Sequence, residues 1–406
     1  MPGWLAPYRV LDLTDERGLL AGQMLGKLGA DVIQLEPPGG SSARRVGPFD
    51  DQGRSFYWSA YAAAKRGVTV DLEQAKGRDL VRRLTERADF LFESARPGRM
   101  AQLGLAYDDL HRLNPNLIHV SITAFGSTGP KSGYAESDLV IWAAGGPLHP
   151  HRDGAGPPLR ISAPQAWLHA AADAAGGALV AHFARLKSGR GQHVDISAQQ
   201  SAAQATLSII ASAAVGHPNF LADLRARASA GSKWQASDGL VELLLPPGPA
   251  LGAWSNNLFR WMRSEGALPD RFKDWDWITL PEKLLSGEIK EADIAAARAA
   301  IAAFLAPRTK RELGEAGMKH KILLAPVNDI GDLLASPHMR ERGFFQDVSE
   351  GGETRTLPWA FAQGPADMFD APRGAPMLGE HNDEVFGDLL GLDDDEQRRL
   401  QAEAVI

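Results

Sequence analysis

Short apolar runs alternate with amphipathic stretches through the first two hundred residues, and this alternation most narrows the possible folds. Runs rich in Val, Ile, Leu and Phe predict strands at residues 9–13, 31–35, 68–72, 90–94, 117–123 and 193–197. Helical patterns lie between several of these runs, at residues 19–28, 75–88 and 107–113. Strands that alternate with helices are typical of a parallel sheet with right-handed crossovers. The sequence therefore predicts an α/β fold.

A long helix is expected from about residue 164 to residue 187, because Pro164 suits its start and Gly189 suits its end. Residues 170–178 within it are nearly all Ala and Gly, with Asp173 as the exception. Small side chains let another element approach a helix closely. We therefore expect this helix to lie at the centre of the packing.

The composition changes after about residue 215. A tryptophan-rich stretch at residues 254–277 and a clear helical pattern at residues 291–306 predict a smaller α+β lobe. Residues 379–400 predict two short helices at the C-terminal end.

Charge and composition exclude several classes of function. The net charge of −7 provides no global attraction for nucleic acid or for an anionic membrane, and no apolar run is long enough to span a membrane. The absence of cysteine excludes disulfides, thiolate metal sites and a cysteine nucleophile, and we expect a cytoplasmic protein without a metal site. Motifs for a dinucleotide-binding turn, a P-loop and a serine hydrolase elbow are missing.

Basic residues lie close to two of the predicted strands. Lys65 and Arg66 precede the strand at residues 68–72, and Arg96 and Arg99 follow the strand at residues 90–94. The carboxyl ends of parallel strands are where open α/β sheets bind ligands, and arginine suits a phosphorylated one. The alternative is that these are ordinary solvated side chains.

Seven strings along the chain carry a family resemblance. In order they are LGADVIQLEPPGG, AKRGVTVDL, ARPGRMAQLGLAYDDL, NPNLIHVSITAFGSTGP, SGRGQHVDIS, LLAPVNDIGDLLASPHMRERGFF and MLGEHNDEVFGDLLGL. Together they resemble the class III (CaiB/BaiF) CoA-transferases. The resemblance implies a large Rossmann-like lobe built from both chain ends, a smaller α+β lobe between them, and two chains interlocked as a dimer. The implied division is residues 1–205, a linker at 206–235, a small lobe at 236–340, and a return to the large lobe at 341–406.

The resemblance also implies where CoA or an acyl-CoA binds as substrate, with no permanently bound cofactor. The implied contacts are Lys65, Arg66, Leu72, Ser94, Ala95, Arg96 and Arg99. Several family features are missing here, among them the usual Val-Leu-Ala-Gly-Pro turn at the start of the first helix. The usual Glu-Asn-Phe-Arg-Pro-Gly string reads Glu-Ser-Ala-Arg-Pro-Gly at residues 93–98, and Pro37 replaces a usual basic residue.

The largest departure is at the family's nucleophile. Counting back from the string SGRG at residues 188–191, the catalytic aspartate of the family falls on Trp167. In active relatives that carboxylate attacks the acyl-CoA thioester and later carries CoA as a thioester itself. An indole has no nucleophilic oxygen. The aspartate of related racemases falls on Ala166, and the remaining candidates for replacement are Asp173 and His169.

Three functions remain open from the sequence. Some class III CoA-transferases, such as the succinyl-CoA:(R)-benzylsuccinate type, pair an aspartate-bearing chain with a homologous chain that lacks it. The first hypothesis is therefore a non-catalytic subunit that binds such a partner, or a second copy of itself. The second is an independently active acyl-CoA isomerase, racemase, hydratase or lyase, and the third is a CoA-ester binding protein.

Overall fold

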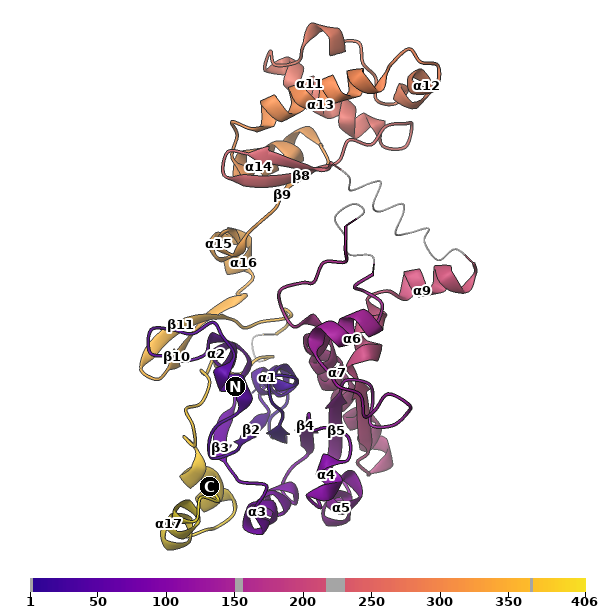
Figure 1. Ribbon diagram of the computed structural model, residues 1–406. Helices are drawn as coiled ribbons and strands as arrows, with labels where there is room; N and C mark the ends of the chain where they lie inside the picture. Colours follow the sequence, from indigo (N-terminus) through magenta and orange to yellow (C-terminus); the bar gives the residue numbers. More distant parts are fainter. Residues whose placement is uncertain (1–2, 150–155, 217–230, 366–367) are drawn as a thin grey trace. The chain divides into compact units, whose positions relative to one another are not determined.

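The computed structural model describes residues 3–149, 156–216, 231–365 and 368–406, which divide into two compact units (Figure 1). Unit 1 comprises Met1–Leu207 and His338–Ile406, and unit 2 comprises Ser208–Pro337. Unit 1 is thus built from both chain ends, and Figure 1 shows the indigo N-terminal and yellow C-terminal segments within it. The expected linker at residues 206–235 includes the whole of helix α9 (Leu207–Ala214) and the start of strand β7 (Lys233–Ala236).

Six parallel strands form the sheet of unit 1. They are β1 (Arg9–Leu13), β2 (Asp31–Glu36), β3 (Arg66–Thr69), β4 (Phe90–Glu93), β5 (Ile118–Thr123) and β6 (His193–Ser197). Their order is β3-β2-β1-β4-β5-β6, which is the Rossmann order, and it reverses direction between β1 and β4. The prediction of an α/β fold with a parallel sheet is confirmed.

Helices cover both faces of this sheet. Those of unit 1 are α1 (Leu19–Lys27), α2 (Phe56–Tyr61), α3 (Ala75–Thr85), α4 (Arg99–Gln102), α5 (Tyr107–Leu113), α6 (Asp138–Ala144), α7 (Gln165–Ser188), α8 (Ala198–Gln204) and α17 (Asp394–Ala402), with a 3₁₀ turn at Ser42–Arg45 and a π-helix at Asp383–Leu389. One core joins α1, α6, α7 and α8 to one face, and a second core joins α3, α5 and the C-terminal helices to the other. The two predicted C-terminal helices are the π-helix and α17.

The long helix α7 lies at the centre of the first core, as the sequence predicts. Pro164 precedes its first residue, and Gly189 ends it in a left-handed conformation with φ of +69°. Its alanines Ala170, Ala171, Ala174, Ala175 and Ala178 are all buried. Their small side chains allow α1 and β5 to approach.

A hairpin that the sequence reading missed completes unit 1. It consists of β10 (Phe345–Glu350) and β11 (Glu353–Pro358), paired antiparallel, and is preceded by α16 (Pro337–Glu341). Gly351 and Gly352 join its strands with φ of +56° and +83°. Two adjacent positive φ angles are what a two-residue hairpin turn requires, so the Gly-Gly pair was a usable signal.

Unit 2 has its own core beneath a three-stranded antiparallel sheet. The sheet has the order β7-β8-β9, with β8 at Gly239–Leu243 and β9 at Leu324–Pro326. Its helices are α11 (Gly252–Ser264), α12 (Leu280–Leu285), α13 (Glu291–Leu305), α14 (Lys310–His320) and α15 (Ile330–Ala335), with a 3₁₀ turn at Asp270–Phe272. Tryptophans of the predicted aromatic stretch, among them Trp261 and Trp277, are buried in this core. In the described part of the chain, no helix is long and apolar enough to cross a membrane.

Candidate functional site

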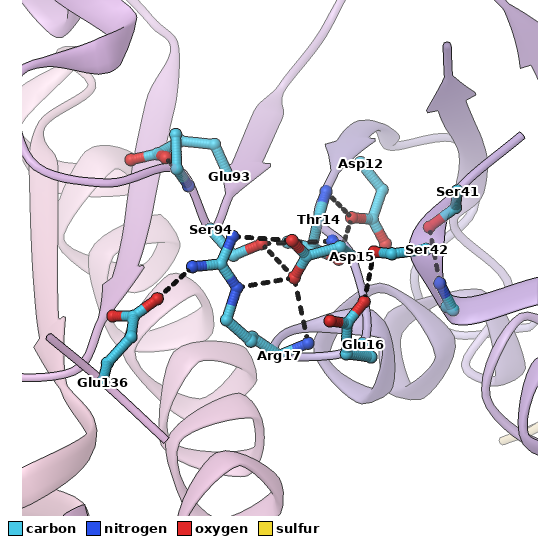
Figure 2. Close-up of polar contacts among 12 residues, drawn as sticks. Asp12, Thr14, Asp15, Glu16, Arg17, Ser41, Ser42, Glu93, Ser94 and Glu136 are labelled. Carbon is cyan, nitrogen blue, oxygen red and sulfur yellow. Dashed lines mark hydrogen bonds and ion pairs between the residues drawn. The ribbon is translucent and has the colours of Figure 1, made fainter. Parts of the chain in front are cut away.

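The residues that follow β1 and β4 meet where the strand order reverses. This is the place where open α/β sheets form a ligand crevice. The Ser94 hydroxyl, directly after β4, lies 3.0 Å from a carboxylate oxygen of Asp15 and accepts the backbone N–H of Asp15 at 3.1 Å. Figure 2 shows these two residues beside Arg17 at the carboxyl edge of the sheet. Ser94 therefore ties the end of β4 to the turn between β1 and α1.

Arg17 is held between two carboxylates. Its guanidinium donates to both oxygens of Asp15, at 2.8 and 2.6 Å, and a third nitrogen donates to Glu136 (Figure 2). Burial opposes the charge of Arg17, but Asp15 and Glu136 outweigh it and raise the pKa of the guanidinium. Arg17 thus stays charged and paired with both carboxylates.

Trp167 lies beside this cluster, in the first turn of α7. Its side chain is buried, and the guanidinium carbon of Arg17 lies 6.0 Å from the centre of its indole. That distance is at the outer limit of a cation–π contact. Asp138, at the start of α6, accepts the backbone N–H of Ala166 at 2.8 Å and so anchors the start of α7. The position expected for a nucleophilic carboxylate therefore holds an aromatic ring packed against a paired arginine.

The two candidate replacements for a nucleophile have other contacts. The His169 ring packs edge-on against Trp142 of α6, with ring centres 5.7 Å apart. The Asp173 carboxylate accepts a hydrogen bond of 3.2 Å from Gln204 of α8. Both contacts link α7 to neighbouring helices, which supports a structural role for each side chain.

Five of the expected CoA contacts follow β3 or β4 at the carboxyl edge. Leu72 and Ala95 pack against the same apolar core, and Ser94 bonds to Asp15. Arg99, at the start of α4, forms an ion pair with Glu73, which links the segments after the two strands. Arg96 is exposed. Leu72, Ser94, Ala95, Arg96 and Arg99 therefore lie on neighbouring segments, and their contact with CoA stays a prediction.

Lys65 and Arg66 do not share this carboxyl edge, because they precede the strand, as the sequence indicates. Strand β3 begins at Arg66, two residues earlier than predicted, so both residues are at its amino end. Arg66 forms a two-pronged ion pair with Asp31 at the start of β2 and also contacts Glu384. The side chain of Lys65 is fully buried, with its ammonium 2.7 Å from Asp12. Both cations are thus paired with protein carboxylates, and their contact with CoA stays a prediction.

A second buried polar pair lies on the other face of the sheet. Glu93 ends β4, and its carboxylate accepts the backbone N–H of Ala95 at 2.7 Å. Burial raises the pKa of Glu93 to about 7, although hydrogen bonds from Ser121 and Ala95 act in the opposite direction. His119 of β5 has a ring nitrogen 4.0 Å from Glu93, and burial lowers its pKa to about 3, with the charge of His193 adding to the effect. Both side chains are therefore uncharged between about pH 3 and pH 7.

Sequence reasoning missed Asp15, Arg17 and Glu136. A signal for the first two was present, because they directly follow a predicted strand in the turn to a predicted helix. Glu136 lies in a loop 119 residues away from Arg17, and only the tertiary structure brings the two together. Among the residues that the structure describes, no group of three or more His, Asp or Glu side chains is arranged to hold a metal ion.

Comparisons with known proteins agree with the fold and the resemblance. The family model CoA-transferase family III matches residues 5–382. The succinyl-CoA:(R)-benzylsuccinate CoA-transferase subunit BbsE of Thauera aromatica is 34% identical over 394 residues, covering 93% of this chain and 92% of that protein. The succinyl-CoA–D-citramalate CoA-transferase of Chloroflexus aurantiacus is 30% identical over 100% of this chain and 98% of its own.

A solved structure of a CaiB/BaiF family protein from Brucella suis superimposes with a TM-score of 0.77 at 26% identity, covering 96% of this chain and 100% of that one. The family match and the relatives both extend over nearly the whole chain. The chain therefore belongs to CoA-transferase family III and is an enzyme of the CoA-transferase class.

Proposed function

We propose that this chain is the subunit without a nucleophile in a heteromeric CoA-transferase. The observation that carries the proposal is Trp167, which stands at the family's aspartate position and is buried beside the paired Arg17. An aspartate in a homologous partner chain then performs the covalent chemistry. The contacts of His169 and Asp173 support this, because each side chain is engaged with a neighbouring helix.

We further propose that CoA binds this chain at the carboxyl edge of the large sheet. The reversal of strand order between β1 and β4 supports this place, as does the grouping of Leu72, Ser94, Ala95, Arg96 and Arg99 after β3 and β4. Arg96 and Arg99 are the cations of this group, so they are assigned to the phosphates. Lys65 and Arg66 are left out of the proposed contacts because both lie at the amino end of β3, and the Lys65 side chain is fully buried.

The proposed partner is a homologous chain that carries the aspartate, interlocked with this one. A relative that is 34% identical over nearly the whole chain is itself named as a subunit of a CoA-transferase. Both relatives described above have succinyl-CoA in their names, and we propose succinyl-CoA as the CoA donor here. The acceptor is then another carboxylic acid.

The test is to assay the purified chain alone and together with an aspartate-bearing homologue from the same organism. The isolated chain should not transfer CoA from succinyl-CoA to an acid, and the mixture should do so at a rate of at least about 1 s⁻¹, ordinary for an enzyme. Turnover at that rate by the isolated chain would contradict the proposal. Copurification of the two chains gives a second readout that does not need the acceptor acid.

Two substitutions of Trp167 refine the test. Trp167→Asp restores the carboxylate and should produce measurable transfer by this chain, because the chain keeps the fold of the family. Trp167→Phe keeps an aromatic ring without a nucleophile and serves as the matched control. Equal activities of the two variants would argue against a simple loss of the aspartate. Loss of an activity native to this chain in both variants would favour an independent enzyme.

A further inference from the structure

Lys65 is the most completely buried cation among the described residues, and all its hydrogen bonds end within the protein. Its ammonium donates to Asp12 at 2.7 Å, to the side-chain oxygen of Gln34 at 2.8 Å, and to the carbonyl of Leu19 at 2.9 Å. An ammonium has three N–H groups, so its capacity is used. The three acceptors belong to β1, β2 and the start of α1.

The acceptors of Lys65 in turn hold the end of β1. The second oxygen of Asp12 accepts both the backbone N–H and the hydroxyl of Thr14, at 3.0 and 2.6 Å (Figure 2). The amide nitrogen of Gln34 donates to the carbonyls of Asp12 and Thr14 at 3.0 and 2.9 Å. Four hydrogen bonds among Asp12, Thr14 and Gln34 thus depend on one buried arrangement.

The next residues along the chain are those of the candidate site. Asp15 follows Thr14, contacts Ser94 and holds Arg17. The direction in which Thr14 leaves β1 therefore decides where the Asp15 carboxylate and the Arg17 guanidinium lie. Gly22 of α1 provides the space, because a Cβ added there would lie 2.0 Å from an oxygen of Asp12 and 3.3 Å from the ammonium of Lys65.

We propose that Lys65 is a positioning residue, which acts through Asp12 and Gln34 to set the backbone of residues 12–17 at the CoA-binding edge. The inference rests on the proposed CoA site for its functional consequence, but the geometry it describes is independent of any ligand. It gives Lys65 a role different from the phosphate contact that its sequence position suggested.

Substitutions in this network can distinguish a role in setting the turn from a role in overall stability. A buried ion pair replaced by well-packed apolar residues is often as stable as before, whereas removal of one partner is strongly destabilising. An apolar replacement of both partners can therefore restore the fold. It cannot accept hydrogen bonds from Thr14, so it cannot restore the direction of the turn.

The experiment compares three variants of the full chain: Lys65→Met, Asp12→Leu with Lys65→Met, and Asp12→Asn with Lys65→Met. Urea unfolding measures stability, hydrogen exchange without ligand measures protection of peptides covering residues 12–17, and calorimetry measures the affinity for CoA. Lys310→Met is the matched control, because Lys310 pairs with Asp332 within unit 2. It should leave exchange at residues 12–17 unchanged.

The Leu/Met variant should remain folded, yet lose at least about tenfold in protection and in CoA affinity, as expected when Thr14 loses its two hydrogen bonds to Asp12. The Asn/Met variant keeps a carbonyl oxygen for Thr14 but lacks the Lys65 ammonium that holds Gln34 and Leu19, so it should recover only part of the protection and the affinity. Wild-type values in this variant would show that Lys65 is not needed to set the turn. Wild-type protection in a folded Leu/Met variant would overturn the proposal, even if Lys65→Met alone fails to fold. If wild-type protein does not bind CoA, the proposed CoA site fails, and the exchange data still decide the role of Lys65.

Discussion

Replacing His119 by Phe should raise the free energy of unfolding, relative to the wild type, by more at pH 5 than at pH 7. His119 is buried, and neither of its ring nitrogens has a hydrogen-bond partner within the described residues. Its pKa is lowered from 6.5 to about 3, so the folded protein keeps the ring neutral while the unfolded chain protonates it below pH 6.5. Stability from this residue is therefore present above pH 6.5 and is lost as the pH falls towards 3.

The magnitude follows from the width of that window. Each pKa unit corresponds to about 1.4 kcal/mol, so His119 lowers the wild-type stability at pH 5 by about 2 kcal/mol relative to pH 6.5. Phe does not titrate, fits among the neighbouring Tyr107 and His193 rings, and loses no hydrogen bond. The difference in unfolding free energy between His119→Phe and the wild type should therefore be about 2 kcal/mol more favourable to the variant at pH 5 than at pH 7.

Glu93 makes stability depend on pH in the opposite direction. Its pKa is raised from 4.5 to about 7 by burial, so its stabilising contribution is complete below pH 4.5 and is lost as the pH rises to about 7. The neighbouring charged or titratable groups are His119, Arg17 and Asp195. Between pH 4.5 and 6.5 the slopes of Glu93 and His119 largely cancel in the wild type. In His119→Phe the Glu93 slope remains, and stability should fall by up to about 3 kcal/mol from pH 4.5 to 7.

Urea unfolding followed by circular dichroism at half-unit steps from pH 4.5 to 7.5 measures these differences. Glu93→Gln is the companion variant, and its stability relative to the wild type should rise with pH over the same range. A difference between His119→Phe and the wild type that is the same at pH 5 and pH 7 would refute the burial argument for His119.

Three further substitutions have outcomes that the structure specifies. Gly22→Ala should lower the free energy of unfolding in urea by about 2–4 kcal/mol, because the new methyl would collide with Asp12. Gly176→Ala in α7 is the matched control. It has open space, so it should be neutral or stabilising by up to about 1 kcal/mol. Arg17→Met should lower the unfolding midpoint and change Trp fluorescence, because Asp15 and Glu136 lose their shared cation, and an unchanged midpoint and spectrum would contradict the clustered arrangement. Arg99→Ala should weaken CoA binding about 3- to 10-fold at low salt and less at high salt, and a salt-independent effect in calorimetry would argue against a phosphate contact.

Local patterns were enough to find most elements of the large sheet. The strands at Arg9–Leu13 and His193–Ser197 and the helix at Tyr107–Leu113 have the predicted bounds, because their apolar spacing and their turns depend on adjacent residues. Strand β3 starts earlier than its apolar run, at Arg66. Pairing with β2 draws Arg66 and Gly67 into the sheet, and Gly67 lets Pro376 approach so closely that a Cβ there would lie 2.8 Å from it.

The sequence by itself determined the α/β class, the central alanine-rich helix, the family, and the indole at the position of the family's nucleophile. Those features depend on residues near one another or on strings that can be compared directly. Only the tertiary structure decided which charged groups meet. Lys65 and Asp12 are 53 residues apart, and Arg17 and Glu136 are 119 apart, so no local pattern reports either pair. Burial then decided the chemistry, because a paired cation inside the protein holds the chain in place, whereas the same residue at the surface could bind a phosphate.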